Sequence, residues 1–313
     1  MVIREKKTLI ILVSAITIVG ICAGFKLTQI SMAPSPATTT ITTTVVPQTA
    51  VIPATTTPSV TIPVLTATPD QIPNQITAKE YLVGDITTGK VYIESNSSTT
   101  VPVASISKLV NALVATTFLS STTRITITKE EADLPADGSG IAAGETYTVS
   151  ELIYPLLLDS SNVAAEALAS SSDLGKFLDF MSSYAWEIGM PDAFFGDPSG
   201  LSASDQASAK DVFTLAQYLY KYRPDILALT RTKQISVVTT TDHGSHIFAS
   251  THPFVSDPRF IGGKTGRTPE AGETMLTILD INGYPTAFIV LGSDIGAREK
   301  DTRLLIDKFF TLE

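Results

Sequence analysis

Hydrophobic residues near the start of the chain form one long uncharged run, and three basic residues precede it. Residues 8–25 contain no charged side chain, and a helix of that length, at about 1.5 Å per residue, approaches the thickness of a bilayer core. Basic residues before such a run favour a cytoplasmic N-terminus. The pattern predicts a cytoplasmic tip and transmembrane signal anchor over residues 1–26. A cleaved signal peptide is the alternative, with Ser31-Met32-Ala33 as its cleavage site.

The next segment has neither helical nor strand periodicity. From Leu27 to Pro69 there is no charge, and Thr, Pro, Val and Ala dominate. Repeated proline blocks regular hydrogen-bonded structure, and the segment has too few large apolar residues for a core. We therefore expect residues 27–77 to form an extended extracytoplasmic stalk. Residues 78–313 would then form one folded domain of a single-pass protein of the cell membrane.

Periodic patterns return at about residue 80. Residues 81–83 and 91–93 are rich in β-formers around turn residues, and residues 275–279 and 287–291 flank Asn282-Gly283, so both pairs predict hairpins. Between them, helical spacing predicts buried or amphipathic helices, and a closing helix follows; these cover residues 105–118, 149–158, 162–170, 174–188, 208–222 and 298–311.

Strands at both ends of this domain, with helices between them, indicate an α+β fold. We expect one antiparallel sheet built from the two chain ends and flanked by helices. A helical lobe, about residues 120–232, would be inserted in the sheet lobe.

Charge and cysteine content narrow the function. The net charge is −9, and because residues 1–26 carry +3, the remaining residues carry −12. No basic cluster is present, so we do not expect nucleic-acid binding. The only cysteine, Cys22, excludes an internal disulfide. Only His243 and His246 lie close together, in a stretch that we interpret as a polar loop, so we expect no metal site and no cofactor.

A serine and a lysine open the predicted helix 105–118. Ser105 and Lys108 are three residues apart and would share one helix face. A serine hydroxyl needs a base to become a good nucleophile, and a lysine can be that base when desolvation lowers its pKa. Backbone N–H groups at a helix N-terminus could stabilise an oxyanion beside Ser105. Alone, the motif is equally consistent with an N-cap serine followed by a surface lysine.

Two further motifs carry polar groups at junctions between predicted elements. Ser160 and Asn162 are two residues apart between helices and could reach one cleft, although a capped turn is the simpler interpretation. Lys264 and Thr265 are flanked by glycines, which would let a ligand approach the backbone closely. Together they could hold a carboxylate, by charge and by hydroxyl donor. The alternative is a glycine-rich loop with an exposed lysine.

Taken together, Ser-x-x-Lys, Ser-x-Asn and Lys-Thr-Gly occur in the order that is typical of penicillin-binding proteins and class A β-lactamases. On these motifs the chain resembles the low-molecular-mass D-alanyl-D-alanine carboxypeptidases, serine peptidases of the β-lactamase/transpeptidase-like fold. The resemblance covers about residues 80–311. It extends to flanking segments, which are Asp85, Thr88-Gly89, Pro102, Ala104, 144–149, Leu152, 189–190, Phe195, 198–201, 208–211 and 270–272.

The resemblance implies a hydrolase that removes the terminal D-alanine from peptidoglycan stem peptides. Ser105 would be acylated, Lys108 would be the base, and Ser160 with Asn162 would relay protons and position the peptide. The implied partners are stem peptides ending in D-Ala-D-Ala, and β-lactams as covalent inhibitors of the same serine.

Substrate binding is implied for the Lys-Thr-Gly strand. Lys264 and Thr265 would bind the terminal carboxylate of the substrate, with Gly266 and Thr268 beside them. The backbone N–H groups of Ser105 and Arg267 would form the oxyanion hole.

Four positions depart from the family pattern, and they leave the substrate preference open. They are Val163, Asp197, Ser199 and Arg267. A DD-endopeptidase on cross-linked peptidoglycan and a catalytically weak wall-binding homologue are alternatives. A β-lactamase is disfavoured, because residues 195–210 contain no Glu to activate a deacylating water.

Overall fold

The computed structural model describes residues 75–135 and 137–311. The predicted anchor, residues 1–26, and nearly all of the predicted stalk, residues 27–77, lie outside the described residues. Among the helices in the described part, none is long and apolar enough to cross a membrane. The anchor, the stalk and the domain boundaries therefore stay predictions.

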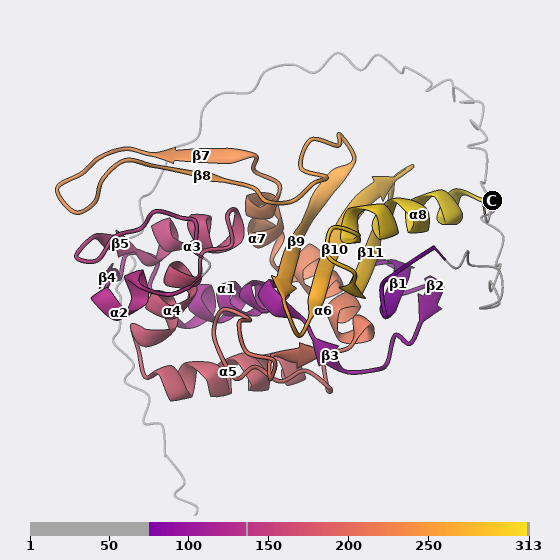
Figure 1. The fold of residues 1–313 in the computed structure, drawn as a ribbon, viewed down its shortest axis with the longest axis horizontal. Coiled ribbons are helices and arrows are strands. Elements are labelled where there is room, and N and C mark those ends of the chain that lie inside the picture. Colours follow the sequence, from indigo (N-terminus) through magenta and orange to yellow (C-terminus); the bar gives the residue numbers. More distant parts are fainter. Residues whose placement is uncertain (1–74, 136, 312–313) are drawn as a thin grey trace, which may run out of the picture. The chain divides into compact units, whose positions relative to one another are not determined.

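A five-stranded antiparallel sheet joins both ends of the described chain (Figure 1). The N-terminal hairpin supplies β1 (Glu80–Asp85) and β2 (Val91–Ser95), and the C-terminal part supplies β9 (Phe260–Thr268), β10 (Gly272–Ile281) and β11 (Tyr284–Ser293). The order β2-β1-β11-β10-β9 pairs the two chain ends through β1 and β11 and leaves β9 at an edge. An edge strand can pair with an extended peptide.

Both predicted hairpins are confirmed. The Asp85 carboxylate accepts hydrogen bonds from the Thr87 N–H and hydroxyl at 2.7 and 2.6 Å, which closes the β1–β2 turn. Asn282 and Gly283 have φ values of +56° and +88°, as the tight turn between β10 and β11 requires.

Alternation along the strands buries both faces of the sheet. Leu82 belongs to a core shared with the helices, whereas its neighbour Val83 packs in a second core with Leu305 and Phe309 of α8 (Arg298–Phe310). Helix α6 (Ala209–Tyr222) contacts β1 and β11. These helices confirm the predicted fold class, an antiparallel sheet flanked by helices.

The remaining helices lie between the two halves of the sheet in sequence, and Figure 1 shows them gathered beside it. Helix α1 (Ser107–Phe118) is buried along most of its length and packs against α3 (Val149–Leu157), α4 (Asn162–Ser170) and α5 (Leu174–Glu187). Thr148 begins α3 through a reciprocal capping box with Glu151.

Several short elements were not predicted. Ser105 lies in a 3₁₀ turn, η2 (Ala104–Ile106), so α1 begins at Ser107 and not at Ser105. The others are α2 (Lys129–Ala132), α7 (Pro224–Thr230) and three two-stranded pairs, namely β3 (Val101–Pro102) with β6 (Gln206–Ala207), β4 (Arg124–Thr126) with β5 (Thr146–Thr148), and β7 (Gln234–Val237) with β8 (His246–Ala249).

The histidine stretch is a loop up to Ser245, as predicted, but it is ordered by specific contacts that the prediction did not include. His243 is buried and stacks on the Tyr147 ring with centroids 4.5 Å apart, and His246 begins β8. Glu145 accepts the Gly244 N–H at 2.8 Å and lies 3.1 Å from His246 Nε2. The tip of the β7–β8 hairpin is thereby fastened to the segment that leads into α3.

Candidate active site

Lys108 is fully buried and joins three segments of the chain. Its Nζ lies 2.9 Å from Ser105 Oγ, 2.8 Å from Asn162 Oδ1 and 2.6 Å from the Ser199 carbonyl oxygen. Burial lowers the pKa of Lys108 to about 7, although nearby carboxylates, Asp197 foremost, act in the opposite direction. A large fraction of this amine is therefore uncharged near neutral pH. It is then able to accept the Ser105 proton.

Ser105 is held by close backbone packing on both sides. Ala104, which precedes it, has a φ of +49°, a left-handed conformation that is uncommon outside glycine. A Cβ added at Gly200 would lie 2.2 Å from the Ala104 carbonyl oxygen, and one added at Gly266 would lie 2.8 Å from Ser105 N. Only glycines fit at these two positions. They bring the α5–α6 loop and β9 against the turn that carries the serine.

The loop between α5 and α6 directs a carbonyl oxygen at Lys108. The Asp197 carboxylate accepts the Ser199 N–H at 2.6 Å, the Ser199 hydroxyl at 2.7 Å and the Gly200 N–H at 2.9 Å. Burial raises the pKa of Asp197, but these hydrogen bonds outweigh it and hold the pKa below its usual range. Two of the positions that depart from the family pattern therefore form one turn, which presents the Ser199 carbonyl to Lys108.

Asn162 is fixed at the start of α4 by a carboxylate that the sequence analysis did not single out. Asp137 Oδ1 accepts the N–H groups of Asn162 and Val163 at 2.5 and 3.1 Å, and Asn162 Nδ2 donates to the Pro135 carbonyl at 3.0 Å. An anion at a helix N-terminus is favourable. With its amide nitrogen engaged, Asn162 turns Oδ1 toward Lys108.

Lys264 extends from the edge strand to the Ser-x-Asn motif. Its Nζ donates to Ser160 Oγ at 2.8 Å and to the Thr265 carbonyl at 3.0 Å. Burial, reinforced by the charges of Lys108 and Arg298, holds the pKa of Lys264 well below its ordinary value. Ser160 has a φ of +66°. The structure thus brings all three sequence motifs together.

A small cleft of about 190 Å³ opens over Ser105. Its volume suits the end of a peptide better than a large ligand. Ser160, Asn162, Thr265, Gly266 and Arg267 line it, together with Asp159, Leu201, Thr251 and Arg298. Lys108 and Lys264 lie buried beneath this lining.

Thr268 lies outside the residues that line the cleft. Its hydroxyl accepts the Ala271 N–H at 3.0 Å and thereby closes the turn between β9 and β10. Its predicted place beside the substrate therefore has no support in this geometry.

Four lining residues were absent from the predicted site, and no local motif marks two of them, Thr251 and Arg298. Thr251 follows β8, donates its N–H to the Leu158 carbonyl at 3.0 Å and places its hydroxyl 3.0 Å from that of Thr265. Arg298 opens α8 and donates from Nη1 to the Gly266 carbonyl at 2.9 Å. Long-range packing alone brings these side chains to the cleft.

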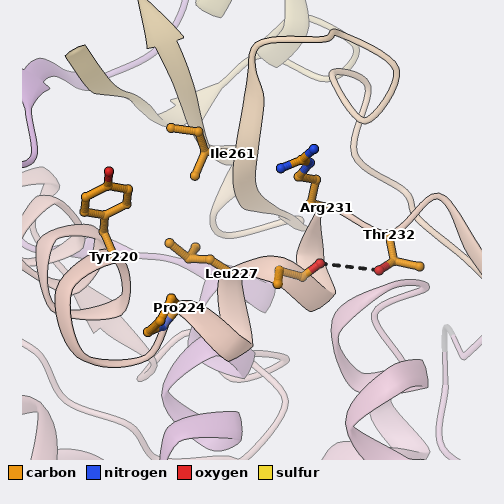
Figure 2. A pocket seen from close by; sticks show the side chains of 7 residues that line it. Tyr220, Pro224, Leu227, Arg231, Thr232 and Ile261 are labelled. Atoms are coloured by element: carbon orange, nitrogen blue, oxygen red, sulfur yellow. Dashed lines mark hydrogen bonds between the residues drawn. The ribbon is translucent and has the colours of Figure 1, made fainter. Parts of the chain in front are cut away.

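A larger hollow of about 590 Å³ lies where α6 and α7 meet the start of β9 (Figure 2). Tyr220, Leu227 and Ile261 give it an apolar wall, and Arg231 is its one charged lining residue. The Thr232 hydroxyl points to the Ala228 carbonyl, 3.4 Å away, and no base adjoins it. This hollow lacks the groups needed to activate a nucleophile.

The cleft over Ser105, by contrast, combines a serine hydroxyl, an amine that is largely uncharged near neutral pH and a second buried lysine. Such a set can activate a hydroxyl and hold an anionic group close to it.

Comparisons with known proteins agree with this chemistry. A family model described as D-alanyl-D-alanine carboxypeptidase matches residues 65–295. A D-alanyl-D-alanine endopeptidase of Haemophilus influenzae is 34% identical over 148 residues, which cover 45% of this chain and 49% of that protein. The chain thus spans about half the length of this relative. A D-alanyl-D-alanine carboxypeptidase of Mycobacterium tuberculosis, DacB2, is 27% identical over 63% of this chain and 68% of its own length.

A solved structure has the same fold. Penicillin-binding protein D2 of Listeria monocytogenes, determined in a cefotaxime-bound form, is 28% identical and superimposes with a TM-score of 0.66. The match covers 75% of this chain and 98% of that one.

Proposed function

Because the chain belongs to the D-alanyl-D-alanine carboxypeptidase family of serine peptidases, we propose that it removes the terminal D-alanine from peptidoglycan stem peptides. One observation carries the proposal. Ser105 Oγ lies 2.9 Å from the amine of Lys108, whose pKa burial lowers to about 7. A serine beside an uncharged amine is the activated nucleophile that an acyl-enzyme mechanism needs.

In the proposed acylation step, Lys108 takes the Ser105 proton and Oγ attacks the carbonyl carbon of the penultimate D-alanine. The negative charge on the carbonyl oxygen would be met by the N–H groups of Ser105 and Arg267. Lys264 and Thr265 would hold the terminal carboxylate. Ser160, linked to Lys264 at 2.8 Å, would relay to the departing amine the proton that Lys108 took from Ser105. Water then hydrolyses the ester and frees Ser105.

Covalent labelling with a fluorescent penicillin tests this proposal. The wild-type protein should take up one label, and Ser105→Ala should take up none while keeping its thermal unfolding midpoint. A wild type that stays unlabelled at a saturating dose would contradict the proposed mechanism, and would favour a catalytically weak wall-binding protein. Label retained by the alanine variant would show that another residue is the nucleophile.

A DD-endopeptidase is the second candidate, and the similarity to the Haemophilus influenzae endopeptidase favours it. The two activities need the same nucleophile but release different products. Purified monomeric pentapeptides and D,D-cross-linked dimers should be incubated separately with the enzyme. Free D-alanine from the monomers supports the carboxypeptidase, whereas conversion of dimers to monomers without free D-alanine supports the endopeptidase.

We also propose that the protein is held in the cell membrane by residues 1–26, with its catalytic domain outside. The uncharged run and the basic residues before it support this placement.

A further inference from the structure

A carboxyl group that the proposed mechanism does not use lies in the same cleft. Asp159 immediately precedes Ser160 and lines the cleft with Ser105 and Asn162. Its Oδ1 atom is shielded from solvent and has no hydrogen-bond partner in the structure. A buried carboxyl oxygen without a partner destabilises a fold, so a structural role does not account for it.

The charged groups around Asp159 are mostly cations. Lys264 of β9 and Lys108 of α1 act on its charge, Arg298 of α8 lines the same cleft, and Asp137, which caps α4, is the nearby anion. Lys264 reaches the residue next to Asp159, because its Nζ donates to the Ser160 hydroxyl at 2.8 Å. Within the part of the chain that the structure describes, no carboxylate lies within 4.0 Å of Lys264 Nζ, so Asp159 acts on this lysine at longer range than an ion pair.

We infer that Asp159 is the internal counter-charge of Lys264, a positioning residue that keeps this lysine cationic before the substrate carboxylate enters the cleft. The inference rests on the proposed function, in which Lys264 binds that carboxylate. Two neighbouring cations and burial all disfavour a charge on Lys264, and the adjacent carboxylate opposes them. Without Asp159, the pKa of Lys264 would be lower still, and this lysine would lose its proton before the substrate carboxylate binds.

The titration of Asp159 suits this role. Burial, and secondarily the charge of Asp137, raises the pKa of Asp159 to about 7, while Lys264 and Lys108 act against that rise. Asp159 is therefore ionised above about pH 7. Lys108 becomes a free base over the same pH range. The base and the counter-charge would thus become competent together.

Removal of the Asp159 charge should shift the pH dependence of acylation in a defined direction. In Asp159→Asn the charge on Lys264 is less favoured, so Lys264 loses its proton at a lower pH. The alkaline limb of the acylation profile should then move to lower pH. The acid limb, which Lys108 sets, should move slightly in the same direction, because Asp159 also favours the charged form of Lys108.

The test measures the second-order rate constant of acylation by a fluorescent penicillin, which carries a carboxylate, from pH 5 to 10 on the full-length protein. We expect the alkaline limb of Asp159→Asn to lie about one pH unit or more below that of wild type. Asp159→Glu, which retains the charge, should restore the limb at least in part. Asp307→Asn removes one exposed carboxylate from α8 and should overlay the wild-type profile.

The possible outcomes distinguish failure of the Asp159 inference from failure of the proposed function. Superimposed profiles for wild type and Asp159→Asn would overturn the inference and leave the proposed function intact. An Asn variant that fails to fold would also overturn it, since it would assign Asp159 a structural role. If the wild type itself takes no label, the proposed function fails, and this inference fails with it.

Discussion

At the residue scale, the chemistry depends on a lysine, Lys108, that is shielded from solvent. Lys108 is fully buried, and its ordinary pKa would leave it charged and unable to accept a proton at neutral pH. Desolvation changes this, because a buried ammonium is disfavoured more strongly than the surrounding carboxylates favour it. The Ser199 carbonyl and Asn162 Oδ1 hold the amine in place beside Ser105.

The first prediction concerns pH. Lys108 must be uncharged to activate Ser105, and its pKa is lowered to about 7, so the acylation rate should rise as pH increases through about 7. Stopped-flow measurement of penicillin acylation checks this. An acid limb near pH 10 would mean that Lys108 titrates like an exposed lysine and would contradict the prediction.

The second prediction concerns the base itself. Lys108→Arg keeps a long basic side chain in the cluster, but the guanidinium stays charged and provides no base near neutral pH, so acylation should slow by about 10²-fold or more. Lys176→Arg, on the exposed surface of α5, makes the same exchange far from the cleft and should label like wild type. Equal rates for Lys108→Arg and wild type would remove Lys108 from its proposed role.

At the element scale, the edge strand β9 and the turn η2 pack closely because β9 has a glycine, Gly266, at the point of contact. A Cβ on Gly266 would meet Thr274 Oγ1 at 2.5 Å and Ser105 N at 2.8 Å. Such distances are too short to be absorbed without displacing the backbone of the nucleophile. The start of α4 has a comparable task, since Asp137 anchors the helix turn that presents Asn162.

The third prediction tests the contact between β9 and η2. Gly266→Ala should reduce acylation by about 10²-fold, because a displacement near 1 Å at the reacting groups is enough for such a loss. Gly175→Ala on α5 adds a Cβ whose nearest neighbour lies at an ordinary 3.4 Å, and its acylation rate should match wild type. A Gly266→Ala variant that acylates at the wild-type rate would show that β9 and η2 do not approach each other as closely as described.

The fourth prediction separates helix capping from catalysis. Asp137→Ala and Thr148→Ala each remove a side chain that caps a helix, and each should lower the free energy of unfolding by about 1 kcal/mol in urea titrations. Only Asp137→Ala should also slow acylation, because α4 carries Asn162 and α3 carries no residue of the cleft. Similar acylation rates for the two variants would contradict this assignment.

At the scale of the whole molecule, the sheet and the helices enclose the cleft from opposite sides. Ser105 and Ser160 come from the helical side, and Lys264 reaches them from the sheet. The β7–β8 hairpin ties the two sides together, through Thr251 at the cleft and through the stacking of His243 on Tyr147 at its tip.

The fifth prediction concerns the whole chain. Full-length protein expressed in a bacterial cell should sediment with membranes, and a variant that lacks residues 1–26 should appear in the soluble fraction. Both should bind fluorescent penicillin, because the cleft is built from residues 105–298. If the protein expressed with residues 1–26 is instead found in the soluble fraction and has lost its N-terminal residues, the cleaved signal peptide is favoured.

The sequence alone predicted the fold class, both hairpins and the longer helices, because periodic burial and turn chemistry are local properties. It also predicted that Ser105, Lys108, Ser160, Asn162 and Lys264 would share one site, because three ordered motifs are improbable together by chance. Its limit was reached where a role depends on contact between distant segments.

Only the tertiary structure decided the surroundings of those groups. Asp137 caps α4 from 25 residues away, and Arg298 reaches Gly266 across 32 residues. His243 is buried by a ring that lies far away in the sequence. The depth at which Lys108 is buried sets its pKa, and that depth is a property of the packed molecule. Sequence patterns identify the groups, whereas solvent exclusion and long-range contacts determine their charge and position.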